Sequence, residues 1–173
     1  MEATGTTAFD GVGARFRAAH EARDIAAMVS LLADDVVLHS PISARVTFRG
    51  RGEVAELFGA VLPLLGELRY RDLVDAGPLQ VLVWSGDLAG REIEETILLR
   101  LSEGGEIEEI TLFIRPLPGL INLLAILGPR LARMRGRPGR ALVAKGAAPL
   151  AAAVGATDRL SGWVLRRNER KNR

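Results

Sequence analysis

The sequence predicts an α+β fold followed by a helical C-terminal extension. Helical patterns come first, and strand patterns separated by glycine-rich turns begin at Arg69. That order favours α+β over alternating βαβ units. The charge pattern adds a boundary: residues 1–129 carry 11 basic and 19 acidic side chains, a net of −8, whereas residues 130–173 carry 12 and 2, a net of +10.

Three helices are predicted in the first part of the chain. The first is indicated by apolar residues at helical spacing, although Gly11 and Gly13 weaken its start: Phe9, Val12, Phe16 and Ala19. Asp24 is expected to cap a second, short helix with one apolar stripe: Ile25, Met28, Val29 and Leu32. A third begins at about Glu53, and Pro63 interrupts its end.

Six strands are predicted. Asp35 to His39 reads as the first, and Arg45 to Phe48 as a short second one. Four longer strands follow as an antiparallel series, at about 69–76, 79–85, 92–101 and 106–115. Turn residues separate them, at Gly77-Pro78, at 86–90 and at 102–105.

The C-terminal part is predicted to be helical and basic, over about 120–134, 141–153 and 157–168. We therefore divide the chain into a domain at 1–119 and an extension at 120–173. The extension is expected to dock on the acidic domain, within or between subunits. A membrane surface contacted through 130–173 is the alternative, and no nucleic-acid partner is expected.

Composition excludes several classes of site. The chain has no cysteine, so disulfides and thiolate chemistry are absent. Its two histidines, His20 and His39, form no metal-binding motif, and Gly50-Arg51-Gly52 lacks the context of a nucleotide-binding loop. We expect neither a metal nor another cofactor. No signal peptide or membrane-spanning run is recognised, so a cytoplasmic location is expected.

Several motifs in order resemble the nuclear transport factor 2-like superfamily, in its SnoaL-like branch. They are the paired helices, Ala33-Asp34-Asp35 before a strand, Phe48-Arg49-Gly50, and two long strands ending at Arg115-Pro116-Leu117. The resemblance covers about residues 9–119. It implies a cone-shaped domain in which a curved antiparallel sheet and three helices surround a pocket, and a homodimer formed through the sheet.

Ketosteroid isomerase, a relative within this superfamily, provides a test of mechanism. Carried over to this chain, its aspartate base falls on Ser40, its tyrosine on Phe16, and its second acid on or next to Ile97. Serine without a base cannot take a proton from carbon, and phenylalanine and isoleucine cannot donate a hydrogen bond. We therefore reject that mechanism for this chain.

Two other residues are candidates for acid–base chemistry. His39 ends a strand at the expected pocket mouth, although alternation places Ser40, not His39, on the face of Val36 and Leu38. Glu95 is the one polar residue on an otherwise apolar strand face, where it either has a raised pKa, pairs with an arginine such as Arg115, or reaches solvent at a bulge.

Further residues are predicted to line the pocket: Phe16, Ser40, Phe58, Trp84, Ile97 and Phe113. For Phe58, Trp84 and Phe113, packing in the core is the favoured alternative. Arg115 is assigned either to an anionic part of the ligand or to a subunit interface. His20 is expected to be exposed.

The leading hypothesis is a protein that binds a small hydrophobic molecule, with isomerase, cyclase or hydrolase activity through His39 or Glu95. The alternative is a non-catalytic dimerisation or adaptor module with a basic tail. A ligand-binding domain should contain an open cavity of about 300–1,000 Å³. In an adaptor, Phe16, Met28, Phe58 and Trp84 should fill that space.

Overall fold

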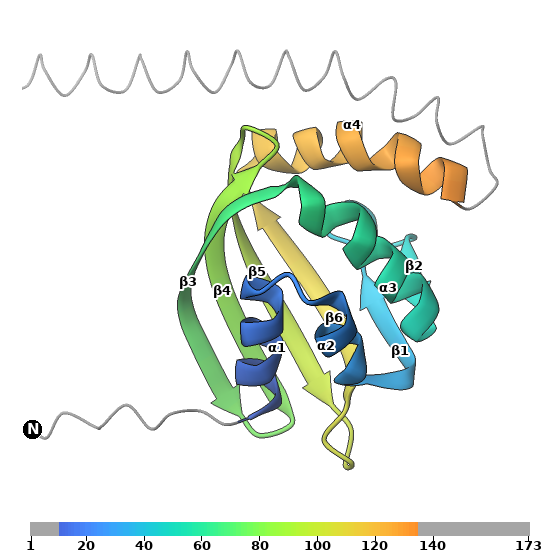
Figure 1. The fold of residues 1–173 in the computed structure, drawn as a ribbon, viewed down its shortest axis with the longest axis vertical. Coiled ribbons are helices and arrows are strands. Elements are labelled where there is room, and N and C mark those ends of the chain that lie inside the picture. Colours follow the sequence, from blue (N-terminus) through green and yellow to red (C-terminus); the bar gives the residue numbers. More distant parts are fainter. Residues whose placement is uncertain (1–10, 135–173) are drawn as a thin grey trace, which may run out of the picture.

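The structure is a computed structural model that describes residues 11–134, and in this range helices cover one face of a single curved sheet (Figure 1). The helices are α1 (Val12–Glu21), α2 (Ile25–Ser30), α3 (Gly50–Val61), the short 3-10 helix η1 (Leu62–Leu64) and α4 (Leu117–Met134). The strands are β1 (Leu32–His39), β2 (Thr47–Arg49), β3 (Leu65–Ala76), β4 (Leu79–Leu88), β5 (Glu92–Leu101) and β6 (Ile107–Arg115).

The strand order is β2-β1-β6-β5-β4-β3, which confirms the α+β class and the antiparallel series β3 to β6. One pairing differs from the prediction of an antiparallel sheet: β1 lies parallel to β6. The sheet is therefore mixed. This pairing brings together strands from the first and last parts of the domain. The alternation of apolar residues within one strand does not indicate which strand it pairs with or in which direction.

The glycines at the start of α1 make room for a buried side chain from β4. The Gln80 side chain is buried, its Oε1 accepts a hydrogen bond from Gly13 N at 2.6 Å, and its Nε2 donates to Asp75 Oδ2 at 2.9 Å. A Cβ on Gly13 would lie 2.5 Å from Gln80 Oε1. The long-range contact thus satisfies one of the free N–H groups of the first turn.

The predicted cap of α2 is confirmed, because Asp24 Oδ1 accepts from Ala27 N at 2.9 Å. Leu32, however, lies in β1 and not in the helix, and β1 begins three residues earlier than predicted. Leu32 is fully buried and pairs with Ile107 of β6. Tertiary pairing therefore extends the strand across a stretch whose local pattern is helical.

α3 also begins earlier than the predicted Glu53. The first residue of α3 is Gly50, whose φ is +75°. A positive φ favours glycine at this position. Glu53 Oε2 accepts a hydrogen bond from Arg49 N at 3.0 Å, so Glu53 stabilises the helix start instead of opening the helix. Pro63 lies in η1, as its position after the helix predicts.

β4 continues to Leu88, so Gly86 belongs to the strand and not to the predicted 86–90 turn. A Cβ on Gly86 would collide with the Glu67 carbonyl group and the Trp84 ring. The glycine therefore permits the close approach of β3 and β4. β3 begins at Leu65, also earlier than predicted.

α4 packs on the domain through Ile121, Leu123 and Leu127, which are buried. Asn122 Nδ2 donates to Leu88 O at 3.1 Å, and Arg130 Nη1 donates to Ala60 O of α3 at 3.5 Å. The helix contains the predicted 120–134 segment, and its first turn spans the proposed boundary after residue 119. The predicted helices at 141–153 and 157–168 lie outside the described residues. Within 11–134, no helix is long and apolar enough to cross a membrane.

Candidate functional site

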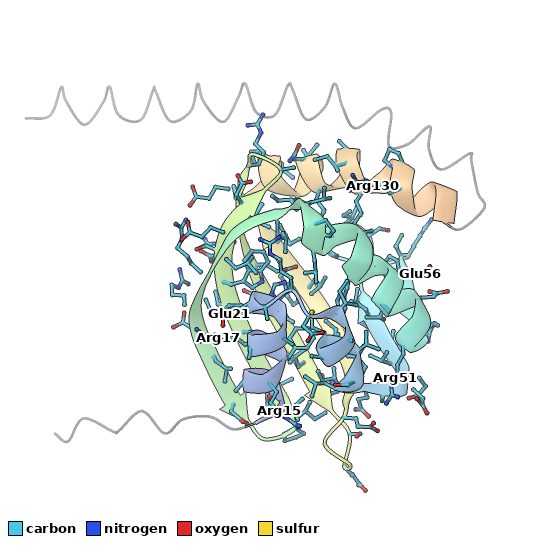
Figure 2. All side chains as sticks on the ribbon, in the orientation of Figure 1. Arg15, Arg17, Glu21, Arg51, Glu56 and Arg130 are labelled. Carbon is cyan, nitrogen blue, oxygen red and sulfur yellow. The ribbon has the colours of Figure 1, made fainter. Side chains whose placement is uncertain are left out.

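A cavity of about 80 Å³ lies between the helices and the inner face of the sheet. Its walls are almost entirely apolar, with Phe16 from α1, Met28 from α2, Phe58 from α3, and Leu123 and Leu127 from α4. Figure 2 shows side chains crowded between these elements, whereas Glu56 lies on the outer side of α3. The cavity is smaller than the roughly 300–1,000 Å³ typical of ligand pockets, so only a small molecule fits without side-chain movement.

Glu95 is the one acidic side chain among the described residues that line the cavity. It lies on the inner face of β5 between Ile93 and Ile97, as the period-two pattern predicts, and it is 8% exposed. No described arginine, lysine or histidine forms an ion pair with it. Burial raises the pKa of the Glu95 carboxyl to about 8. At neutral pH the carboxyl is therefore mostly protonated.

Trp84 stands directly opposite Glu95 on β4. Its indole N–H favours the carboxylate and so lowers the pKa of Glu95. This effect is smaller than the rise that burial causes. Nevertheless Trp84 Nε1 is completely buried and has no hydrogen bond of good geometry within the described range. An unsatisfied buried donor is costly, and here it lies beside a carboxyl that can change its charge.

His20 and Tyr70 form a second polar group against the same tryptophan. His20 Nδ1 lies 2.6 Å from the Tyr70 hydroxyl oxygen, and the His20 ring packs edge-to-face on Trp84 at a centroid distance of 5.4 Å. Burial, aided by the charge of Arg23, lowers the pKa of His20 to about 4, so the imidazole is neutral at neutral pH. Burial together with the nearby Glu95 charge raises the pKa of Tyr70, so its hydroxyl stays protonated.

The prediction that His20 is exposed is therefore wrong, because the side chain is buried and lines the cavity. Its position near the charged Glu21 and Arg23 suggested a surface residue. Its spacing of four from Phe16, one helical turn along the same face of α1, was the signal that pointed inward.

The structure brings most of the predicted site residues together. Those that line the cavity with Glu95 are Phe16, Ser40, Phe58, Trp84 and Ile97. Phe16, Ser40 and Ile97 are also the three positions to which the resemblance assigns the isomerase roles. All three line the cavity of this chain, and their side chains are apolar or weakly polar.

Three predicted residues lie elsewhere. His39 is half-exposed beside Glu109, with 3.8 Å between Nε2 and Oε1, and does not line this cavity. Phe113 is on the outer face of the sheet and is 57% exposed. Arg115 pairs with Glu94 at 2.6 Å, on the opposite face from Glu95, so the suggested Arg115–Glu95 pair does not form. Side chains of β5 alternate between faces, and the arginine meets the outward neighbour.

Metal binding has no support in the part of the chain that the structure describes, where no three histidine, aspartate or glutamate side chains are grouped to hold an ion. The cavity lining supplies one carboxyl and one neutral imidazole, too few ligands for a structural site. That the protein uses no metal or cofactor stays a prediction.

A curved sheet closed by helices around an apolar cavity defines the nuclear transport factor 2-like class of folds, and the resemblance to this superfamily is confirmed. Residues 14–110, more than half of the chain, match the SnoaL-like domain. The chain belongs to the SnoaL-like domain family. No curated protein sequence matches it.

Solved structures with the same fold extend the comparison. A steroid delta-isomerase from Pseudomonas aeruginosa is similar with a TM-score of 0.64 and 25% identity, over 72% of this chain and 92% of the isomerase. A bacterial protein with a cystatin-like fold from Silicibacter pomeroyi gives 0.63 and 25%, over 75% and 98%. The epoxide hydrolase/cyclase-like enzyme SalBIII, at 0.52 and 13% over 60% and 88%, shows the fold alone.

Proposed function

We propose that the protein binds a small, uncharged, mostly apolar molecule in the cavity and that Glu95 exchanges a proton with it. The observation that carries this proposal is a buried carboxyl without an ion-pair partner in a mostly apolar cavity. An ionised carboxylate in such a place is costly, so the group is kept neutral and can donate a hydrogen bond. A protonated acid with a pKa of about 8 can also release its proton near neutral pH.

Size and charge restrict the molecule. The cavity of about 80 Å³ excludes large ligands, and its lining contains no arginine or lysine to neutralise an anion. A ligand with an apolar ring and a single polar group fits both conditions. The similar structure described as a steroid delta-isomerase supports an isomerase-type reaction on such a molecule.

The test is proton exchange with a small ketone in D₂O. Full-length protein is incubated with cyclohexanone, and deuterium uptake at the carbon next to the carbonyl group is followed by mass spectrometry. We expect uptake above the buffer rate, and a loss of about 100-fold or more in Glu95→Gln, since a positioned general acid–base contributes about 10²–10⁴. Glu92→Gln on the same strand, where Glu92 is exposed, is the matched control and should keep the activity.

Uptake that is equal in Glu95→Gln and wild type would assign the exchange to another group. Native mass spectrometry of the same samples shows whether cyclohexanone is bound. Bound ketone without exchange would reduce the proposal to ligand binding, and absence of both would refute it.

A second candidate, a homodimerisation module, has its own observation on the outer face of the sheet. We name the outer-face patch for the partly or largely exposed residues that lie there side by side: Val74, Val81, Val83, Thr96, Leu98, Thr111 and Phe113. Ion pairs border it at both ends, Arg115 with Glu94 at 2.6 Å and Arg100 with Glu109 at 3.7 Å. The outer-face patch thus has an apolar centre and a rim that carries both positive and negative side chains. Such a surface is suited to bind the same surface of a second copy of the chain.

A further inference from the structure

His20 is a buried polar side chain that the proposed action of Glu95 does not use. It comes from α1, and its ring lies between Phe16, at 6.4 Å between ring centroids, and Trp84, at 5.4 Å. Three aromatic side chains therefore fix the plane of the imidazole, the third being Tyr70 at 5.8 Å.

The contact with Tyr70 sets which nitrogen carries the proton. The separation between His20 Nδ1 and the Tyr70 hydroxyl oxygen is 2.6 Å. Because an imidazole nitrogen accepts hydrogen bonds more strongly than a phenol oxygen does, and a phenol is the better donor, Tyr70 O–H is the favoured donor in this contact. The neutral imidazole then holds its hydrogen on Nε2. Arg17 lies over the Tyr70 ring at 5.0 Å and helps to hold the phenol in place.

His20 Nε2 makes no hydrogen bond with any described residue, and the His20 side chain lines the cavity. Trp84 connects it to Glu95, because Trp84 contacts the His20 ring and is the cross-strand neighbour of Glu95. Two of the polar side chains that line the cavity are thus neighbours of one indole ring: a donor that keeps its hydrogen and an acid that can lose its own.

We propose that His20 Nε2–H binds a hydrogen-bond acceptor atom of the ligand, such as a carbonyl oxygen, and that Tyr70 is the positioning residue that fixes this tautomer. The inference rests on the proposed function, because it assumes that a ligand enters the cavity. It adds the chemical class of that ligand, a neutral molecule whose polar atom accepts a hydrogen bond. It also makes His20 the residue that distinguishes such a ligand from a hydrocarbon of the same shape.

The tautomer is tested first, without any ligand. The chain contains only two histidines, so ¹⁵N chemical shifts of labelled wild type and of His39→Phe identify His20. We expect the shift pattern of a neutral imidazole protonated at Nε2. Tyr70→Phe should change that pattern towards a mixture of tautomers, and a wild-type pattern of protonated Nδ1 would overturn the inference.

Binding is tested with two probes of the same shape, cyclohexanone and methylenecyclohexane, of which only the ketone has an acceptor oxygen. We expect cyclohexanone to bind about tenfold more tightly to wild type, as one hydrogen bond provides. His20→Phe should remove the difference, and His39→Phe, outside the cavity, should keep it. If both probes bind wild type equally, the inference about His20 is overturned and the proposed function stands. If neither probe binds, both the inference and the proposed function are overturned.

Discussion

At the scale of single residues, the unusual environment of Glu95 has a consequence for stability as well as for chemistry. The carboxyl is enclosed by apolar side chains and meets only the Trp84 indole N–H, which is too weak a partner to offset its loss of hydration. The folded protein therefore holds a proton on Glu95 at pH values at which the unfolded chain has released it.

The direction of the resulting pH dependence follows from this difference. The pKa of Glu95 is 4.5 in the unfolded reference and about 8 in the folded state, so between these values the folded state binds more protons. Its contribution to the free energy of unfolding therefore falls as pH rises from about 4.5 to about 8, and is constant above that. Glu95→Gln does not titrate and should gain stability relative to wild type over this interval, by a few kcal/mol.

Urea unfolding of both proteins from about pH 5 to about pH 9 measures this difference. The lowered pKa of His20 gives an opposite slope between about 4 and 6.5, but His20 is present in both proteins, so it cancels in the difference. Glu92→Gln should run parallel to wild type. A difference between Glu95→Gln and wild type that does not change with pH would mean that Glu95 is ionised in the folded state.

At the scale of elements, the contact between α1 and β4 depends on a glycine that the helix itself would not favour. Gly13 lies in the first turn, and its backbone N–H is bonded to the buried Gln80 side chain. The interior of α3 contains a second helical glycine, Gly59, whose Cβ position is 4.0 Å from Ile25 Cδ1 and clear of backbone. The two sites differ in surroundings and not in secondary structure.

Alanine at these two positions should have opposite effects. Gly13→Ala places a methyl group 2.5 Å from Gln80 Oε1, and displacing that buried amide should lower the free energy of unfolding by about 1–3 kcal/mol. Gly59→Ala should raise it by up to about 1 kcal/mol through helix propensity. Thermal and urea unfolding of the two variants check this, and a stabilised Gly13→Ala would contradict the Gln80 contact.

At the scale of the whole molecule, the two faces of the sheet have different chemistry. The inner face encloses the cavity under α1 to α4, and the outer face carries the outer-face patch, of which Phe113 is the most exposed side chain. We therefore expect a homodimer joined through the outer faces, which leaves the cavities on opposite sides of the assembly.

Phe113→Glu tests this arrangement. A carboxylate within a buried apolar interface should convert the dimer to a monomer, as measured by light scattering after gel filtration. Leu117→Glu is the matched control, because Leu117 is similarly exposed, at 58%, but lies outside the outer-face patch. A Phe113→Glu protein that keeps the mass of wild type would exclude this face as the interface.

The sequence by itself determined the features that repeat along a single segment. The alternation in β5 placed Glu95 among inward residues, that of β1 placed Ser40 with Val36 and Leu38, and Asp24 marked the start of α2. These features depend on side-chain direction within one helix or strand, which has a fixed period.

Only the tertiary structure decided the contacts between distant segments. Burial against Phe16, Trp84 and Tyr70, the last of which is fifty residues away along the chain, turns a histidine beside charged neighbours into a neutral part of the cavity. The parallel pairing of β1 with β6 extends β1 back to Leu32, and the alternation of β5 turns Glu94, not Glu95, towards Arg115. The physical reason is the same in each case. The burial and the pKa of a side chain depend on contacts between distant segments, and local sequence periodicity does not encode those contacts.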